Sequence, residues 1–265
     1  MLNYLNLVNI YMPDGISLLS AEAILMVTIL TFIPCFISIV TGFGGAIFSM
    51  PLLTLIIPVK IAAPISIIVS TISAFYGTWI HRRIIDWKSI IKLIISSFIG
   101  IPFGIYALAS TPEHLLKKGL GIFLVIYSLL SLFTKKSLKF NSFPAKEWII
   151  YPCGFFAGIF GAALTASGPP IVLYGVWRNL SPPVFRGTLC AFFSANNIGI
   201  LVSMNANGIL TGSSFKLVVL SIPFMTFGWL IGNKVHNLLT KSISEIKIRK
   251  FVFIILLALG IIMLY

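Results

Sequence analysis

The chain has 265 residues, of which 58% are hydrophobic and only 9% are charged. A soluble domain carries about 25% charged residues, so this composition excludes an ordinary soluble fold and indicates a protein embedded in lipid. The net charge of +13 comes from short basic clusters between apolar runs, a pattern typical of cytoplasmic loops rather than of a nucleic-acid-binding face. We therefore expect an all-α polytopic membrane protein that contacts the lipid bilayer and no nucleic acid.

The first half of the chain begins with residues 1–16, a mixed polar and apolar stretch without a basic leader. No cleavable signal peptide is expected there, and we assign it as an N-terminal extracytoplasmic segment. A spanning helix needs about 20 mostly apolar residues. The expected order is an apolar helix at 20–40, a glycine-rich break at 41–45, a short apolar piece at 46–57, and full spans at 62–80, 91–110 and 116–133.

The second half repeats this order after a basic polar stretch, 134–146, which we expect to be a cytoplasmic linker. The expected elements are an apolar piece at 148–164, a break at 165–170, a short piece at 171–177, and full spans at 184–204, 214–233 and 249–265. Each half is thus one broken segment followed by three transmembrane helices. The sequence predicts two transmembrane repeats, 17–133 and 147–265.

The broken segments either cross the membrane once each or fold back as re-entrant hairpins. If they fold back, one side of the membrane receives few of the 19 Lys and Arg residues, namely Lys60, Lys117, Lys118 and Lys216. If they cross, the basic residues divide almost evenly. Because cytoplasmic loops are rich in Lys and Arg, the pattern favours hairpins, with both termini extracytoplasmic and the two repeats inverted, as in many secondary transporters.

The first break supplies three candidate substrate-binding residues, Gly44, Gly45 and Pro51. The glycines let the backbone leave the helix, and Pro51 lacks an N–H and disturbs helical hydrogen bonding. Irregular backbone at membrane depth is tolerated only where it is buried in protein or lines a cavity. Close helix packing through small residues is the alternative interpretation of this segment.

The second break contains Thr165, Ser167, Gly168, Pro169 and Pro170. Two successive prolines after Ser-Gly predict an extended turn, after which a helix begins. The N-terminus of that helix would offer free amides and its dipole to an anion, beside the hydroxyls of Thr165 and Ser167. A turn at the membrane surface is the alternative, but breaks at matching places in both halves favour a binding site.

Polar side chains inside predicted spans complete the candidate site. Asn196 and Asn197 lie near the middle of their span, and Thr71 lies with Ser70 and Ser73 in the matching region of the first half. Polar side chains at membrane depth usually face the protein interior. Hydrogen bonding to neighbouring helices is the simpler reading of the serines, whereas an amide has four hydrogen-bonding sites to satisfy.

The ionisable residues and cysteines are not placed where cation transport, metal binding or catalysis would need them. The carboxylates and histidines lie at or near span ends or in loops, so an anion or a polar neutral solute fits better than a cation or a proton relay. Cys35, Cys153 and Cys190 each lie in an apolar run, which predicts packing residues and neither a disulfide nor a metal site. We also expect no cofactor and no enzymatic activity, since no GxxxxGK[ST] motif is present and Ser167 has no base at depth.

The segments around both breaks carry a family resemblance. The stretches that match are TGFGGAIFSMPLL at 41–53, HRRIIDW at 81–87, GAALTASGPPIVLYG at 161–175 and FRGTLCAFFSANN at 185–197. They resemble the sulfite exporter TauE/SafE family of membrane transporters over nearly the whole chain. The resemblance implies export or uptake of small anions, often sulfur-containing ones. The chain departs from the family pattern at Ala46 and at residues 162–165, where many members have glycine.

The resemblance implies motif positions for Gly44, Gly45, Pro51, Ser167, Gly168, Pro169 and Pro170. The predicted function is that of a secondary transporter in a bacterial cytoplasmic membrane. It would move a sulfite- or sulfonate-like anion by alternating access, with the substrate held at the two helix breaks near the midplane. A passive anion channel is the alternative within transport, and a membrane enzyme or a scaffold is the alternative outside it.

Overall fold

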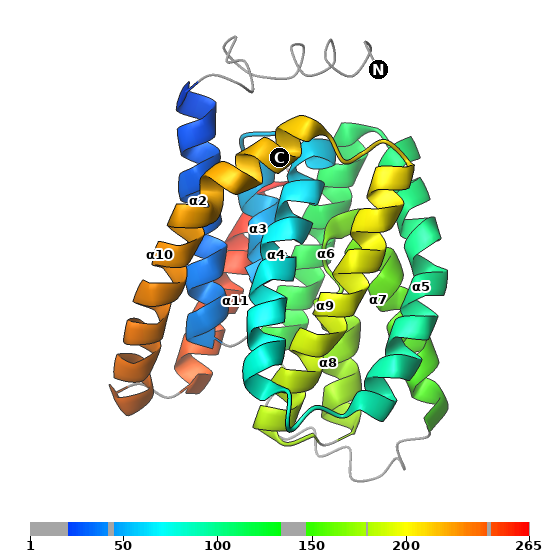
Figure 1. Cartoon of the computed structure of the whole chain (residues 1–265), viewed down its shortest axis with the longest axis vertical. Coiled ribbons are helices and arrows are strands. Elements are labelled where there is room, and N and C mark those ends of the chain that lie inside the picture. Colours follow the sequence, from blue (N-terminus) through cyan, green and yellow to red (C-terminus); the bar gives the residue numbers. More distant parts are fainter. Residues whose placement is uncertain (1–20, 42–44, 134–146, 179, 243–244, 265) are drawn as a thin grey trace.

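The computed structural model describes residues 21–41, 45–133, 147–178, 180–242 and 245–264, and over these residues the chain is helical (Figure 1). The predicted N-terminal segment 1–16 and linker 134–146 lie outside the described residues. The helices are α2 (Ala21–Thr41), α3 (Gly45–Thr54), α4 (Val59–His81), α5 (Trp87–Ser110), α6 (Glu113–Phe133), the 3-10 turn η2 (Glu147–Ile149), α7 (Ile150–Leu164), α8 (Gly168–Trp177), α9 (Pro182–Ala206), α10 (Gly212–Ser242) and α11 (Glu245–Ile262).

Among the described residues, 6 segments are long and apolar enough to cross a membrane: Val59–His81, Trp87–Ser110, Glu113–Leu132, Glu147–Leu164, Pro183–Ala206 and Ser214–Gly232. A multi-pass membrane protein is thereby confirmed. The predicted span 249–265 corresponds to α11, and the apolar helix Lys250–Ile262 lies within it. The segment Glu147–Leu164 meets the length and composition of a span, although we assigned it to a hairpin arm.

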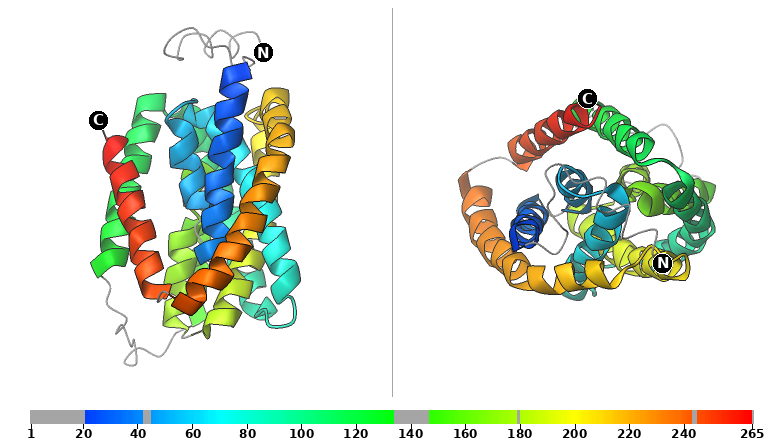
Figure 2. Two further views of the ribbon diagram at one scale, coloured as in Figure 1. Left: turned by 90° about the vertical axis from the view of Figure 1, so that its left-hand side faces the viewer. Right: turned by 90° about the horizontal axis from the view of Figure 1, so that it is seen from above.

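Two short helices fold back on the helices that precede them. A Cβ atom added at Gly45, the first residue of α3, would lie 3.0 Å from the Pro34 carbonyl oxygen of α2, so α3 returns along α2. In the second half, α8 returns beside α7 after a turn at 165–167 (Figure 2). The predicted break at 165–170 is therefore too long. Pro169 and Pro170 belong to the first turn of α8, where a missing N–H costs no helical hydrogen bond.

The long helices pack in pairs that draw on both halves of the chain. The most extensive pairs are α5 with α7, α2 with α10, α4 with α9, and α6 with α11. The corresponding helices of the two halves are α2 and α7, α4 and α9, α5 and α10, and α6 and α11. If each helix is replaced by its counterpart in the other half, the same four pairs result, so the packing is symmetric between the halves. Figure 1 also shows successive helices alternating in direction, so that corresponding helices of the two halves run in opposite directions.

Glycines allow α5 and α7 to touch through their backbones. A Cβ atom at Gly158 would collide with the Ser97 carbonyl oxygen, and one at Gly154 would lie 2.5 Å from the carbonyl oxygen of Leu93. Small residues let membrane helices approach this closely and gain dispersion contacts. The arm α7 is consequently fixed against α5, whereas the packing of α8 against α7 is less extensive.

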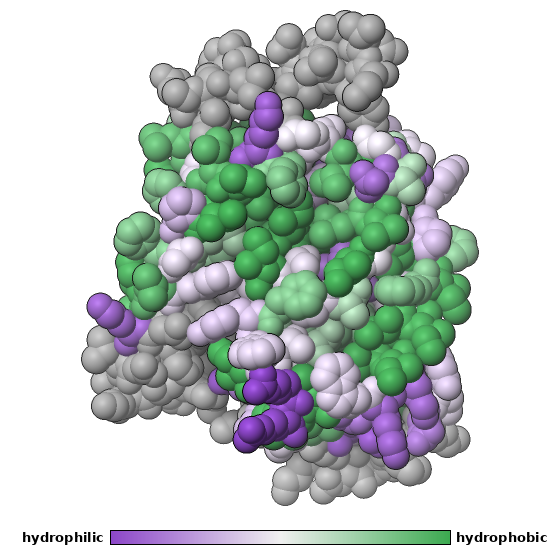
Figure 3. Space-filling model, viewed as in Figure 1, coloured by the Kyte–Doolittle hydropathy of each residue, from purple (hydrophilic) through white to green (hydrophobic). Residues whose placement is uncertain are grey.

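On the face shown in Figure 3, apolar residues cover much of the upper part and the right-hand side, and strongly hydrophilic residues gather at the lower end. Large apolar side chains are exposed on the long helices, such as Phe103, Tyr106 and Phe227. Charged residues follow the helix ends, and Arg82, Arg83, Lys88, Lys92, Arg178 and Arg186 flank the connections α4–α5 and α8–α9. We call this lower end of the bundle in Figure 1 the basic end.

Candidate functional site

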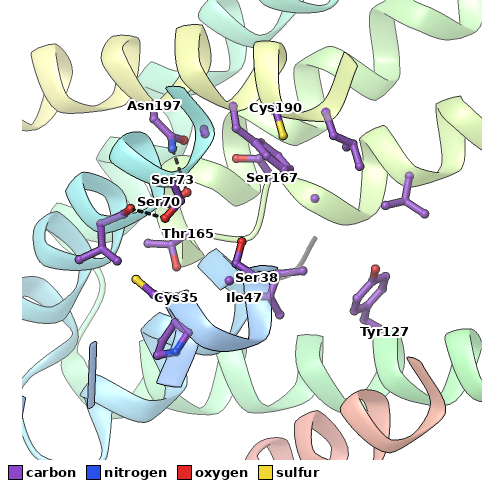
Figure 4. Close-up of a pocket in the computed structure, with 18 residues that line it drawn as sticks. Cys35, Ser38, Ile47, Ser70, Ser73, Tyr127, Thr165, Ser167, Cys190 and Asn197 are labelled. Atoms are coloured by element: carbon purple, nitrogen blue, oxygen red, sulfur yellow. Dashed lines mark hydrogen bonds between the residues drawn. The ribbon is translucent and has the colours of Figure 1, made fainter. Parts of the chain in front are cut away.

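A cavity of about 70 Å³ lies inside the bundle, between α2 and the start of α3 on one side and the α7–α8 turn on the other (Figure 4). One water requires about 10–15 Å³ in such a measure, so this space holds a few waters or one small anion. Its walls come from α2, α3, α4, α6, α8, α9 and the α7–α8 turn. The polar side chains in its lining are Cys35, Ser38, Ser70, Ser73, Tyr127, Thr165, Ser167, Cys190 and Asn197.

Thr165 is the most unusual residue of the lining. Its backbone has φ 54° and ψ 26°, in the left-handed region that a β-branched residue rarely adopts. Its N–H still donates to the Gly161 carbonyl oxygen at 3.0 Å, which ends α7. The side chain is 2% exposed, and its Oγ1 atom has no hydrogen-bond partner among the described residues. A strained backbone therefore holds an unsatisfied hydroxyl at the cavity, an arrangement that accumulates at functional sites.

The N-terminus of α8 opens on the same cavity. Ser167 precedes the helix and Gly168 begins it, and both line the space. Pro169 and Pro170 have no N–H, so Gly168 provides the free amide of the first three helical residues. Pro169 itself does not line the cavity.

The N-terminus of α3 approaches from the other side. Gly45 and Ile47 line the cavity, and the Ile47 side chain lies 3.2 Å from where a Cβ atom on Gly168 would be. Pro51 lies inside α3 and away from the cavity. Since it lacks an N–H, it cannot bond the carbonyl of Ile47 four residues before it, which leaves that acceptor free of a helical hydrogen bond. Gly44, also predicted, lies outside the described residues.

The two asparagines occupy different layers. Asn197 lines the cavity and donates from Nδ2 to Ser70 Oγ at 3.0 Å, which joins α9 to α4. Asn196 is 0% exposed and stands behind the lining. Its Nδ2 donates to Ser167 Oγ at 3.1 Å, and its Oδ1 accepts from the Ser97 hydroxyl. Asn196 thus positions Ser167, whose hydroxyl can itself donate one hydrogen bond.

Thr71 is not brought to the cavity. Its Oγ1 donates to the Ile67 carbonyl oxygen at 2.6 Å within α4. Such back-bonding is common for threonine in apolar helices. The lining residues that we did not predict as site residues include Cys35, Ser38, Tyr127 and Cys190. Cys153 instead packs in an apolar cluster with Ala157 and other residues of α5, α7, α8 and α9.

The electrostatics of the cavity are set by backbone and neutral side chains. No Lys, Arg, His, Asp or Glu is among the described residues that line it. Two helix N-termini, those of α3 and α8, point positive ends toward it. The donors are hydroxyls, thiols, one amide and free N–H groups, a set that can replace part of the hydration shell of an anion.

Comparison with known proteins adds an identification. Residues 27–263 match the family described as Sulfite exporter TauE/SafE, a range that includes all of the second folded-back pair, the first pair from residue 27 onward and every lining residue of the cavity. No curated protein and no solved structure matches the chain. The family match confirms the resemblance carried by the segments around the two breaks. The chain therefore belongs to the Sulfite exporter TauE/SafE family of membrane transporters.

Proposed function

We propose that this chain is a secondary transporter for a small, singly charged, sulfur-containing anion such as hydrogen sulfite or a short sulfonate. The observation that carries the proposal is the convergence of two helix N-termini on a cavity lined by neutral donors. The family match supports transport of an anion rather than catalysis. Thr165, Ser167, Gly168 and the N-terminal amides of α3 are the proposed contacts.

The charge of the substrate follows from the cost of dehydration. The idealised cost of moving one unit charge from water to a medium of low dielectric constant is of order 20 kcal/mol, and it grows with the square of the charge. Each helix N-terminus acts as roughly half a positive charge. Two of them balance about one negative charge, and no cationic side chain in the described lining compensates a second. A monoanion is therefore favoured over a dianion.

Alternating access is supported by the arrangement of the helices. The exchangeable helix pairs and their opposed directions are what two inverted repeats, 17–133 and 147–265, would produce. Under this proposal α2–α3 and α7–α8 are the re-entrant hairpins, and their tips meet around the substrate. A rocking motion of one bundle against the other would then open the cavity to each side in turn.

The orientation follows the basic residues. The basic end would face the cytoplasm of a bacterial cell, since cytoplasmic loops carry the excess of Lys and Arg. The start of α2 and the end of α11 lie at the opposite end of the bundle, so both termini would be extracytoplasmic (Figure 2).

Ligand-dependent thermal stability tests the site and the substrate charge together. A ligand that binds only the folded protein raises its unfolding temperature, and the rise grows with the ratio of ligand concentration to Kd. Hydrogen sulfite loses its proton near neutral pH, whereas methanesulfonate keeps one negative charge. We expect stabilisation by methanesulfonate at all pH values tested and by sulfite only in the more acidic buffers. Equal stabilisation by sulfate, or stabilisation by neutral solutes alone, would refute the monoanion proposal.

The variant Ser167→Ala should weaken the binding of methanesulfonate by about ten-fold, because a hydrogen bond to a charged group contributes about 1.5–3 kcal/mol. Ser66→Ala is the matched control, since Ser66 is buried in α4 and lies outside the cavity. Counterflow of labelled methanesulfonate in proteoliposomes then separates a carrier from a channel, because only a carrier exchanges internal for external substrate against a gradient.

A further inference from the structure

A second pocket lies at the basic end, between the N-terminal ends of α5 and α7 and the C-terminal end of α8. Its volume is about 350 Å³. Three cationic side chains line it, those of Lys88, Lys92 and Arg178, together with the carboxylates of Asp86 and Glu147. It is separate from the central cavity, and the two share no lining residue.

The two carboxylates already have donors. Asp86 caps α5, accepting from the Ser89 N–H at 3.3 Å and from the Ser89 hydroxyl at 2.6 Å, and Tyr174 donates to that hydroxyl at 2.7 Å. Glu147 accepts from Lys92 Nζ at 3.0 Å. The Lys92 and Glu147 side chains are 40% and 80% exposed. An ion pair this exposed contributes little and exchanges readily.

Lys88 and Arg178 have no ion-pair partner among the described residues. Both are exposed, and they come from different parts of the chain, since Lys88 lies in the first turn of α5 and Arg178 directly follows α8. A guanidinium and an ammonium that face one pocket are suited to a phosphate group, which arginine binds in a bidentate manner.

The remaining walls are apolar and lie at the depth of a membrane interface. Ile91 and Ile149 line the pocket, and Ile91 is 57% exposed on the outer side of α5. Trp87 and Trp148, at the starts of α5 and of η2, are 51% and 61% exposed. Exposed tryptophans at helix ends mark the level of lipid headgroups. A free phosphate ion gains nothing from contact with the apolar walls, whereas a lipid can place its phosphate beside the basic side chains and its apolar part against these walls.

We propose that this pocket binds the phosphate group of an anionic membrane lipid. Arg178 and Lys88 contact the phosphate, and Lys92 leaves the Glu147 carboxylate to bind the phosphate as well. Ile91 and Ile149 contact the glycerol and the first acyl carbons. Basic pockets between membrane helices are suited to such headgroups. Arg178 is joined to α8, whose other end lines the central cavity, so a bound lipid would hold one hairpin arm in place.

The test is a titration of the full-length protein in zwitterionic detergent micelles with phosphatidylglycerol, followed by thermal unfolding. The variant is Lys88→Gln with Arg178→Gln. The matched control is Lys117→Gln with Lys118→Gln, which removes the same charge at the opposite end of the bundle. Parallel titrations use phosphatidylcholine and inorganic phosphate.

We expect phosphatidylglycerol to stabilise the native chain and the control equally. The double variant should need about 30-fold more lipid for the same effect, which equals about 2 kcal/mol for two basic side chains. Unchanged affinity in the double variant, or equal stabilisation by phosphatidylcholine, would overturn the proposal. Full stabilisation by inorganic phosphate would overturn the lipid as the source of the phosphate. None of these outcomes depends on transport of a sulfur-containing anion.

Discussion

Replacing Thr165 by glycine is expected to make the protein more stable and its substrate binding weaker. The residue has φ 54° and carries a buried hydroxyl without a partner among the described residues. Glycine removes both features, because it adopts the left-handed region without steric cost and has no side chain. Most substitutions of buried residues destabilise, so a gain in stability would be specific evidence.

The magnitude follows from four terms. Relief of the left-handed conformation contributes roughly 1–2 kcal/mol, and removal of the unsatisfied hydroxyl contributes about 1–3 kcal/mol. The greater freedom of glycine in the unfolded chain costs about 0.4–1 kcal/mol, and loss of the buried methyl group costs about 0.8 kcal/mol. The net expectation is a stabilisation of about 2 kcal/mol in the absence of ligand. Thr165→Ala keeps the strain and loses the hydroxyl, so it should gain less.

The assay is thermal unfolding of the purified variants with and without methanesulfonate. Thr165→Gly should unfold at a higher temperature than the native chain without ligand, yet bind the anion about ten-fold more weakly because one donor is lost. Thr165→Ser keeps the hydroxyl and should bind normally. A Thr165→Gly protein that is less stable than the native chain, or that binds the anion as tightly, would refute the assignment of strain and of a contact to this residue.

Three further outcomes are expected. Gly158→Ala should destabilise the protein by about 3 kcal/mol, since its new Cβ atom would overlap the backbone of α5. Gly119→Ala is the control and should stabilise α6 by up to about 1 kcal/mol, because a Cβ atom there meets nothing within 4 Å. Equal melting temperatures of the two variants would argue against the backbone contact between α5 and α7. Asn196→Ala should cost about 2 kcal/mol and weaken methanesulfonate binding, because it leaves two buried hydroxyls without their partner; unchanged binding affinity would contradict its positioning role. Maleimide labelling of Cys190, which lines the cavity, should slow when methanesulfonate binds, while labelling of Cys153 should not change; equal effects on both would indicate a global change instead.

Local sequence features predicted much of the fold because membranes restrict the choices. Runs of about 20 apolar residues are helical in lipid, and the spans from α4 to α6 are found where predicted. Glycine, serine and proline at 165–170 located the turn between α7 and α8, but not its length. Proline is compatible with both an extended turn and a first helical turn, so the sequence alone did not assign Pro169 and Pro170 to α8.

The candidate site was less accessible to sequence reasoning because it depends on which side of each helix faces inward. Asn196 and Asn197 are adjacent in sequence, yet one stands behind Ser167 and the other lines the cavity. Cys35 and Tyr127 were not predicted as lining residues because both lie within apolar runs that have no break. Thr71 lies beside Ser70, but about 100° around α4, and its hydroxyl bonds within the helix.

The strongest test of the proposed substrate site is counterflow of labelled methanesulfonate into proteoliposomes, measured for the native chain and for Gly168→Leu. Gly168 lines the cavity, and a Cβ atom there would already lie 3.2 Å from Ile47 Cδ1, so a leucine side chain would fill the space between the hairpin tips. Gly119→Leu is the control, because a Cβ atom at Gly119 meets nothing within 4 Å. We expect exchange by the native chain and the control, and none by a folded Gly168→Leu protein. Exchange at the native rate by Gly168→Leu would show that the substrate passes elsewhere and would contradict the proposed site.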